Sequence, residues 1–200
     1  MTAPSPVLAG YVTRVWTELV LRSFARETNL LVPSSRFLLV GVGPVADGLA
    51  IALTRLGARV EVASDDPVEL VSIAHRSAVV ARHIVTAQFI SADVDVVIAT
   101  GRSHPALTPD AVAAADRPLI AVNAAPPPGG DAGAFHGDGI VGTERNLTRL
   151  SGPRPIFVAP QVSPGELDHA VAEVRSTFAD LLESVGADDV EAELAKVLLS

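Results

Sequence analysis

Residues 36–50 decide the fold of this chain and read Arg36-Phe-Leu-Leu-Val-Gly41-Val-Gly43-Pro-Val-Ala-Asp-Gly48-Leu-Ala50. Residues 37–40 form a continuous apolar run of strand length, which is typical of a central parallel strand covered on both faces. Residues 45–56 have the pattern of a helix, and Gly57 is a helix terminator. The stretch therefore predicts a strand, a glycine turn and a helix in direct succession.

The glycine turn has the properties of a pyrophosphate site. Gly41 can take the tight turn, and Gly43 has no Cβ to keep a phosphate away from the backbone. The helix N-terminus adds unpaired N–H groups and a partial positive charge. Ala46 stands where the commoner G-x-G-x-x-G motif has its third glycine, and we expect Gly48 to let the helix pack closely on the strand. The predicted phosphate contacts are Gly41, Gly43, Pro44 and Val45.

Strands and helices alternate along the rest of the chain, apart from a loop at 126–139 that is rich in proline and glycine. This alternation predicts right-handed crossovers and a parallel sheet. We expect one dinucleotide-binding domain over 1–200: a doubly wound, Rossmann-like α/β fold with a core at 36–162 and extra N-terminal (7–29) and C-terminal (163–199) helices. The further strands are expected at 58–63, near Ile84, and at 94–99, 119–122 and 155–159; the further helices are expected at 67–77, 108–115, 163–185 and 188–199.

An acidic segment follows the second predicted strand. It reads Ser64-Asp65-Asp66 and lies about 20 residues beyond the glycines, where an acid binds the ribose hydroxyls of a dinucleotide. Asp66 precedes Pro67 and is also suited to cap the next helix. We therefore expect Asp65 to contact the ribose while Asp66 caps the helix.

Composition excludes several classes of function. The chain has a formal net charge of -8 and no local basic patch, which argues against nucleic-acid and membrane-surface partners. It has no cysteine, and Lys196 is its only lysine, so thiolate, Schiff-base and P-loop chemistry are unsupported. The histidines lack carboxylate partners at metal-ligand spacing, so no metal is expected. With no apolar run of membrane-spanning length and no targeting segment, we expect a cytoplasmic protein.

The region from about Glu18 to Asn123 resembles the NAD-binding domain of S-adenosylhomocysteine hydrolase. The family pattern G-Y-G-x-V-G-K-G-x-A, then G-A-R-V, then an acid followed by x-D-P is similar to residues 41–50, Gly57-Ala58-Arg59-Val60 and Asp66-Pro67, with the interval from Gly41 to Arg59 preserved. Residues 26–29, 99–101 and 121–123 are similar to further family segments. The resemblance implies a Rossmann fold and NAD as cofactor, and it adds Ser64, Thr100, Gly101 and Asn123 to the cofactor contacts, with the last three framing the nicotinamide.

The departures from this family concern the reaction. The family's substrate domain has no counterpart in the few residues before Val7, and Ser64 stands where the family has its ribose-binding acid. Residues 124–126 read Ala-Ala-Pro in place of the family's I-G-H, so the histidine near the nicotinamide is missing. The resemblance therefore implies the fold and the cofactor, and it does not imply hydrolysis of adenosylhomocysteine.

Three functions stay open on sequence alone. The first is an NAD-dependent oxidoreductase acting on a small metabolite, with His104 at the rim of the sheet as proton donor or acceptor; a solvent-exposed loop histidine is the alternative. The second is a non-catalytic NAD-binding regulatory module or subunit. The third is an S-adenosylmethionine-dependent methyltransferase, which would need an acid just before Gly41, where Val40 stands. The long flanking helices also predict a homodimer.

Overall fold

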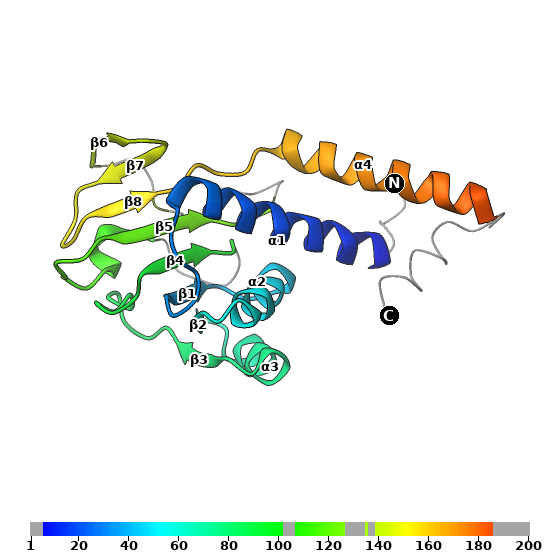
Figure 1. The fold of residues 1–200 in the computed structure, drawn as a ribbon. Coiled ribbons are helices and arrows are strands. Elements are labelled where there is room, and N and C mark those ends of the chain that lie inside the picture. The colour runs from blue at the N-terminus through cyan, green and yellow to red at the C-terminus, as the bar shows by residue number, and fades with distance from the viewer. Residues whose placement is uncertain (1–5, 102–106, 127–134, 136–138, 186–200) are drawn as a thin grey trace.

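The structure is a computed structural model that describes residues 6–101, 107–126, 135 and 139–185. Figure 1 shows one sheet with the long helices of the two chain ends lying side by side. The elements in chain order are α1 (Pro6–Thr28), β1 (Arg36–Val40), α2 (Pro44–Arg55), β2 (Arg59–Ser64), α3 (Pro67–Ser77), β3 (Val80–His83), β4 (Val96–Ala99), the 3-10 turn η1 (Pro109–Ala111), β5 (Leu119–Asn123), β6 (Ile140–Glu144), β7 (Leu147–Leu150), β8 (Ile156–Val158) and α4 (Pro164–Val185).

The eight strands form one sheet in the order β3-β2-β1-β4-β5-β8-β7-β6. The chain runs outward from β1 to β3 and then returns to place β4 on the other side of β1, so the strand order reverses at that point. Val40 is in register with Ala63 of β2 and Ala99 of β4, and Ala99 is in register with Asn123 of β5. The segments that follow these four parallel strands therefore leave the sheet at the same edge, beside the reversal, where α/β sheets bind ligands.

Alternate residues of β1 belong to two separate apolar cores. Phe37 and Leu39 pack in the core that includes buried side chains of α1, α2 and α3. Leu38 and Val40 pack in a second core on the opposite face, which includes Phe89 and the segment around η1. Both faces of β1 are thus buried, as the continuous apolar run predicted.

Trp16 fixes α1 to the sheet. Its side chain is fully buried, and its Nε1 donates a hydrogen bond of 2.7 Å to the carbonyl oxygen of Ala124, just beyond β5. The adjacent α2 lies close to α1. A Cβ added at Gly48 of α2 would lie only 2.9 Å from Oγ1 of Thr17 on α1. The expectation that Gly48 serves the packing of helix on strand is therefore wrong: it serves the packing of α2 on α1.

The helix expected at 108–115 does not form, and only the 3-10 turn η1 is present. Thr108 makes no side-chain cap for it. Ile90 and Val112 instead form a parallel bridge, with the N–H of Ile90 donating to the carbonyl of Ala111 and the N–H of Ala113 donating to the carbonyl of Ile90. These non-local hydrogen bonds compete with a helix for the same backbone groups.

Two further corrections concern strands. The third strand lies at Val80–His83, slightly before the expected position near Ile84. The hairpin of β6 and β7 was not expected; it is antiparallel, and β7 is also antiparallel to β8, so the sheet is mixed rather than wholly parallel. All of β6 is exposed, so the strand lacks the apolar pattern from which a buried strand is predicted.

A capping box is present at the start of α4. Oγ of Ser163 accepts a hydrogen bond from the N–H of Glu166, and a Glu166 carboxylate oxygen accepts one from the N–H of Ser163 at 2.8 Å. The second bond lowers the pKa of Glu166. None of the described helices is both long and apolar enough to cross a membrane. The helix expected at 188–199 lies outside the described residues.

Candidate functional site

The site begins at the turn between β1 and α2. Gly41 has φ +103° and donates its N–H to the carbonyl of Ala63 on β2 at 2.7 Å. Gly43 has φ +100° with ψ -176°, a conformation that only glycine adopts without strain. The sequence therefore needs glycine at both positions to turn the chain from the sheet edge into α2.

Among the described residues, no side chain caps the N-terminus of α2. Gly43 is its N-cap and supplies no side-chain hydrogen bond, and Pro44 follows with no N–H. The N–H of Asp47 is the first to bond back, to the carbonyl of Gly43, so the N–H groups of Val45 and Ala46 precede the helical hydrogen bonds. Two backbone donors and the positive end of the helix dipole thus face the turn.

One acidic side chain in the first turn of α2 is neutralised by an arginine. Asp47 accepts hydrogen bonds from Nε and Nη2 of Arg76 on α3, at 3.1 and 2.6 Å. This pair removes a free carboxylate from the neighbourhood of the turn and joins α2 to α3. Nothing in the sequence identified Arg76, since it lies 29 residues from Asp47 and in another helix.

A cavity of about 420 Å³ opens between the glycine turn and the start of α3. Its described lining is acidic in balance, because it includes three acidic residues and Arg76 is the only basic residue among those described. Its lining residues are Val42, Gly43, Pro44, Asp47, Asp66, Glu69 and Arg76. A cavity of this charge accepts a sugar with free hydroxyls more readily than a sugar that carries an additional phosphate.

The three polar residues after β2 have separate positions. Ser64 is fully buried, and its Oγ accepts a hydrogen bond from the N–H of Asp66 at 3.0 Å. Asp66 caps α3 by accepting from the N–H groups of Val68 and Glu69. Asp65 is exposed at the edge of the sheet, and within the described residues its carboxylate has no partner. The cap expected at Asp66 is confirmed. Asp65 is not among the described residues that line the cavity, and its contact with a ribose stays a prediction.

We expect Asp66→Ala to lower the free energy of unfolding by about 1 kcal/mol, because it removes the cap of α3. Urea denaturation followed by circular dichroism measures the change. Asp66→Asn keeps an oxygen that accepts the same hydrogen bonds, so it should retain most of the stability. Equal losses in both variants would show that the charge of Asp66, rather than its cap, stabilises α3.

The predicted contacts at the ends of β4 and β5 lie together on the other side of the turn. Thr100 is buried and donates from Oγ1 to the carbonyl of Val40 at 3.1 Å. Gly101 has φ +79°, and a Cβ there would lie 2.5 Å from the Cβ of Ala125. Oδ1 of Asn123 accepts from the N–H of Ala125 at 3.0 Å. These contacts hold the ends of β1, β4 and β5 in a fixed arrangement beside the glycine turn.

His104 lies outside the described residues, as does most of the loop at 126–139. Phe135, from that loop, is described and packs in the second core. Among the described residues, no three histidine or acidic side chains come together as a group that could hold a metal ion. His83, which was not predicted as a site residue, has its ring Nε2 3.2 Å from the carbonyl oxygen of Asp65.

No protein-family model and no curated protein matches the sequence. Solved structures share its fold. A transhydrogenase from Sinorhizobium meliloti is similar with TM-score 0.57 and 16% identity, over 94% of this chain and 60% of that chain. An L-alanine dehydrogenase is similar with TM-score 0.55 and 15% identity, over 92% and 56%.

Dipicolinate synthase, A chain, from Bacillus subtilis is similar with TM-score 0.50 and 16% identity, over 91% of this chain and 56% of that chain. The present chain thus spans less than two thirds of each of these three structures. At such identities the likeness concerns the fold, and it establishes an α/β, Rossmann-like architecture with a mostly parallel sheet and helices at both ends.

Proposed function

We propose that this chain binds NAD at the turn between β1 and α2. The observation that carries the proposal is the N-terminus of α2, which no described side chain caps: Gly43 at φ +100° precedes the N–H groups of Val45 and Ala46, beside the reversal of strand order. These donors fit a pyrophosphate. Asp65 would accept hydrogen bonds from the ribose hydroxyls, and Thr100, Gly101 and Asn123 would border the nicotinamide half.

Two further observations support a dinucleotide. The names of two structures of similar fold, a transhydrogenase and an L-alanine dehydrogenase, denote enzymes that move hydrogen. The acidic cavity beside α3 favours NAD over NADP, because a 2′-phosphate would meet Asp66 and Glu69 while Arg76 is already paired with Asp47.

Thermal shift tests the proposal, because a ligand bound by the folded state alone raises the melting temperature by mass action. At a concentration one hundred times its dissociation constant, NAD should add about 2.7 kcal/mol to the free energy of unfolding. NADP at the same concentration should add less. A response to S-adenosylmethionine without a response to NAD or NADH would replace this proposal with the methyltransferase.

We expect Asp65→Asn to weaken NAD binding by about tenfold or more, because hydrogen bonds to a charged acceptor contribute about 1.5–3 kcal/mol. The free energy of unfolding without ligand should stay within about 0.5 kcal/mol of the wild type, since Asp65 is exposed. Isothermal titration calorimetry measures the affinity. The matched control is Asp168→Asn, which removes one exposed carboxylate from α4; unchanged NAD affinity in both variants would remove Asp65 from the site.

The reaction that we propose is oxidation or reduction of a small metabolite, with His104 moving a proton at the reacting oxygen. A bound nicotinamide supplies the two-electron exchange. His104→Ala should then lower turnover by about 10²–10⁴-fold and leave NAD affinity within about twofold, because the histidine serves the substrate rather than the cofactor. Retained NAD binding with no turnover of any alcohol, carbonyl or amino acid by the wild type would favour the regulatory module instead.

A further inference from the structure

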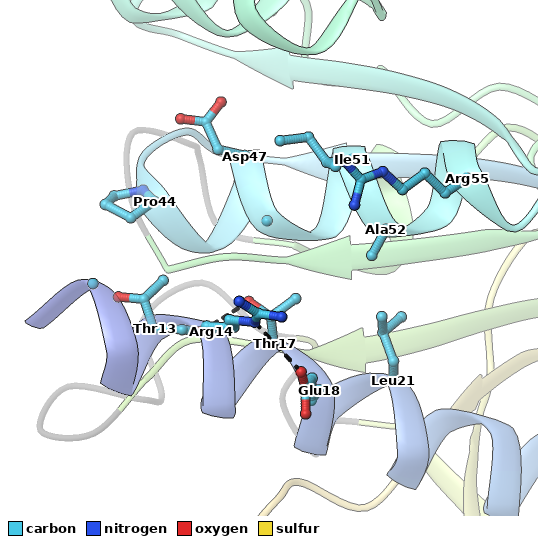
Figure 2. Close-up of a pocket in the computed structure, with 12 residues that line it drawn as sticks. Thr13, Arg14, Thr17, Glu18, Leu21, Pro44, Asp47, Ile51, Ala52 and Arg55 are labelled. Atoms are coloured by element: carbon cyan, nitrogen blue, oxygen red, sulfur yellow. Dashed lines mark hydrogen bonds and ion pairs between the residues drawn. The ribbon is translucent and has the colours of Figure 1, made fainter. Parts of the chain in front are cut away.

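The ion pair of Asp47 and Arg76 lies at the cavity beside the glycine turn. Both residues line this cavity of about 420 Å³, together with Gly43. Asp47 belongs to the first turn of α2, and Figure 2 shows it near Pro44 with its carboxylate on the side of α2 that faces away from α1. Arg76 belongs to the last turn of α3. The pair therefore borders the space in which the proposed function sets the adenosine ribose of NAD.

The guanidinium of Arg76 is engaged by partners within the protein. Its Nε and Nη2 donate to one carboxylate oxygen of Asp47, at 3.1 and 2.6 Å. Its Nη1 donates to Oγ of Ser72, one turn earlier in α3. Each of the three nitrogens thus has an acceptor on α2 or α3. Because the described lining of the cavity includes no other basic residue, it offers a ligand no uncommitted cation.

Asp47 opposes the release of Arg76. The Asp47 side chain is only 22% exposed, whereas that of Arg76 is 47% exposed. Separating a carboxylate from its cation costs more free energy when the carboxylate is shielded from water. The other carboxylate oxygen of Asp47 lies 3.5 Å from Oγ of Ser77, and a neutral hydroxyl at that distance does not replace a cation. A ligand that draws Arg76 away from Asp47 must therefore compensate for the loss of this pair.

The remaining charges of the described lining are acidic. Asp66 is the N-cap of α3, and Glu69 lies in the first turn of that helix. Ribose hydroxyls can donate hydrogen bonds to such acids. A phosphate has no hydrogen to spare for them at neutral pH and is bound best by the fork of an arginine. Acceptance of a 2′-phosphate in this cavity thus depends on whether Arg76 is free.

We propose that Asp47 determines which nucleotides the cavity accepts, because it holds Arg76 away from the ligand. A ribose with free hydroxyls is accepted, and a ribose that carries a 2′-phosphate is rejected. Asp47 is thus a positioning residue that acts through Arg76, in contrast to Asp65, for which we propose direct contact with the ribose. The inference rests on the proposed function and adds a determinant of specificity to it.

Two pairs of ligands that differ only in a 2′-phosphate test the inference. They are NAD with NADP, and adenosine 5′-monophosphate with adenosine 2′,5′-bisphosphate. Isothermal titration calorimetry gives the Kd of the 2′-phosphorylated ligand divided by the Kd of its counterpart. Asp47→Ala should lower this ratio about tenfold or more in both pairs, because the freed guanidinium can form charge-assisted hydrogen bonds to the phosphate. A purely structural role of Asp47 would change both constants alike and leave the ratio as it is.

Two matched variants separate the release of Arg76 from the change in net charge. Glu69→Gln removes one acid from the cavity, as Asp47→Ala does, but leaves Arg76 paired. Because Glu69 is exposed, this change should lower the ratio by about threefold or less. Asp47→Ala combined with Arg76→Gln removes one charge of each sign, and its ratio should return to within about threefold of the wild type. Asp47→Asn weakens the pair more mildly and should lower the ratio in the same direction if Asp47→Ala does not fold.

Three results would overturn the inference. The first is a wild-type ratio in Asp47→Ala and Asp47→Asn, and the second is an equal fall in Glu69→Gln, which would show that net charge decides. The third is a ratio that stays low without Arg76. Binding of the two mononucleotides without binding of NAD would end the proposed function alone, and the mononucleotide ratio would then decide the inference. If the wild type and the variants bind none of the four ligands, both are wrong.

Discussion

Gly43→Val is expected to raise the dissociation constant for NAD at least about hundredfold. Gly43 has φ +100°, where an L side chain costs about 1–3 kcal/mol, and a β-branched residue suits this backbone worst. A side chain there would also occupy the space through which a pyrophosphate reaches the N–H groups of Val45 and Ala46. Binding is measured by isothermal titration calorimetry and by the fluorescence of NADH.

The control for Gly43→Val is Gly165→Ala in the first turn of α4, where an added Cβ has only an ordinary contact at 4.0 Å. That variant should bind NAD as the wild type does. Gly43→Ala serves as a milder change if the valine variant does not fold. Wild-type NAD affinity in folded Gly43→Val would place the cofactor elsewhere and end the proposed function.

Trp16→Ala is expected to lower the free energy of unfolding by about 3–5 kcal/mol, the range for truncation of a large buried aromatic side chain. Trp16 is fully buried and joins α1 to the end of β5 through its bond to Ala124. Because a domain is stabilised by only about 5–15 kcal/mol, this single change should remove a substantial part of the free energy of unfolding. Urea denaturation followed by circular dichroism is the measurement, since Trp16 is the only tryptophan.

Trp16→Phe separates packing from hydrogen bonding. It keeps most of the ring volume but leaves the carbonyl of Ala124 without its donor, which costs about 1–3 kcal/mol. The exposed Val68 of α3 provides the control, and Val68→Ala should change stability by about 0.5 kcal/mol or less. A loss below 1 kcal/mol for Trp16→Ala would show that α1 is not held to the sheet in this way.

The glycine turn was predictable because its determinants all lie within residues 37–56. A buried apolar run, two glycines and a helix pattern fix β1, the turn and α2 through local conformation. The cap at Asp66 is equally local and is confirmed, and the capping box at Ser163 likewise joins residues only three apart. The pyrophosphate contacts assigned from this stretch remain predictions about a ligand.

The parts of the site that the sequence missed depend on residues far apart in the chain. Arg76 on α3 forms an ion pair with Asp47 on α2, and no sequence pattern near either residue predicts this pair. Gly101 lies against Ala125, and that contact exists only because β4 and β5 are neighbours in the sheet. The assignment of these residues to the edge of the sheet could be predicted, but their contacts could not.

By itself, the sequence determined the alternation of strands and helices, the glycine turn and the helix caps, because each follows from the conformational preferences of a few adjacent residues. Only the tertiary structure decided that Gly48 serves α1, that residues 108–115 pair with Ile90 instead of forming a helix, and that an exposed hairpin completes the sheet. In each case the deciding contact or hydrogen bond has its partner elsewhere in the fold, so the free energy that selects it arises only once those distant segments have come together.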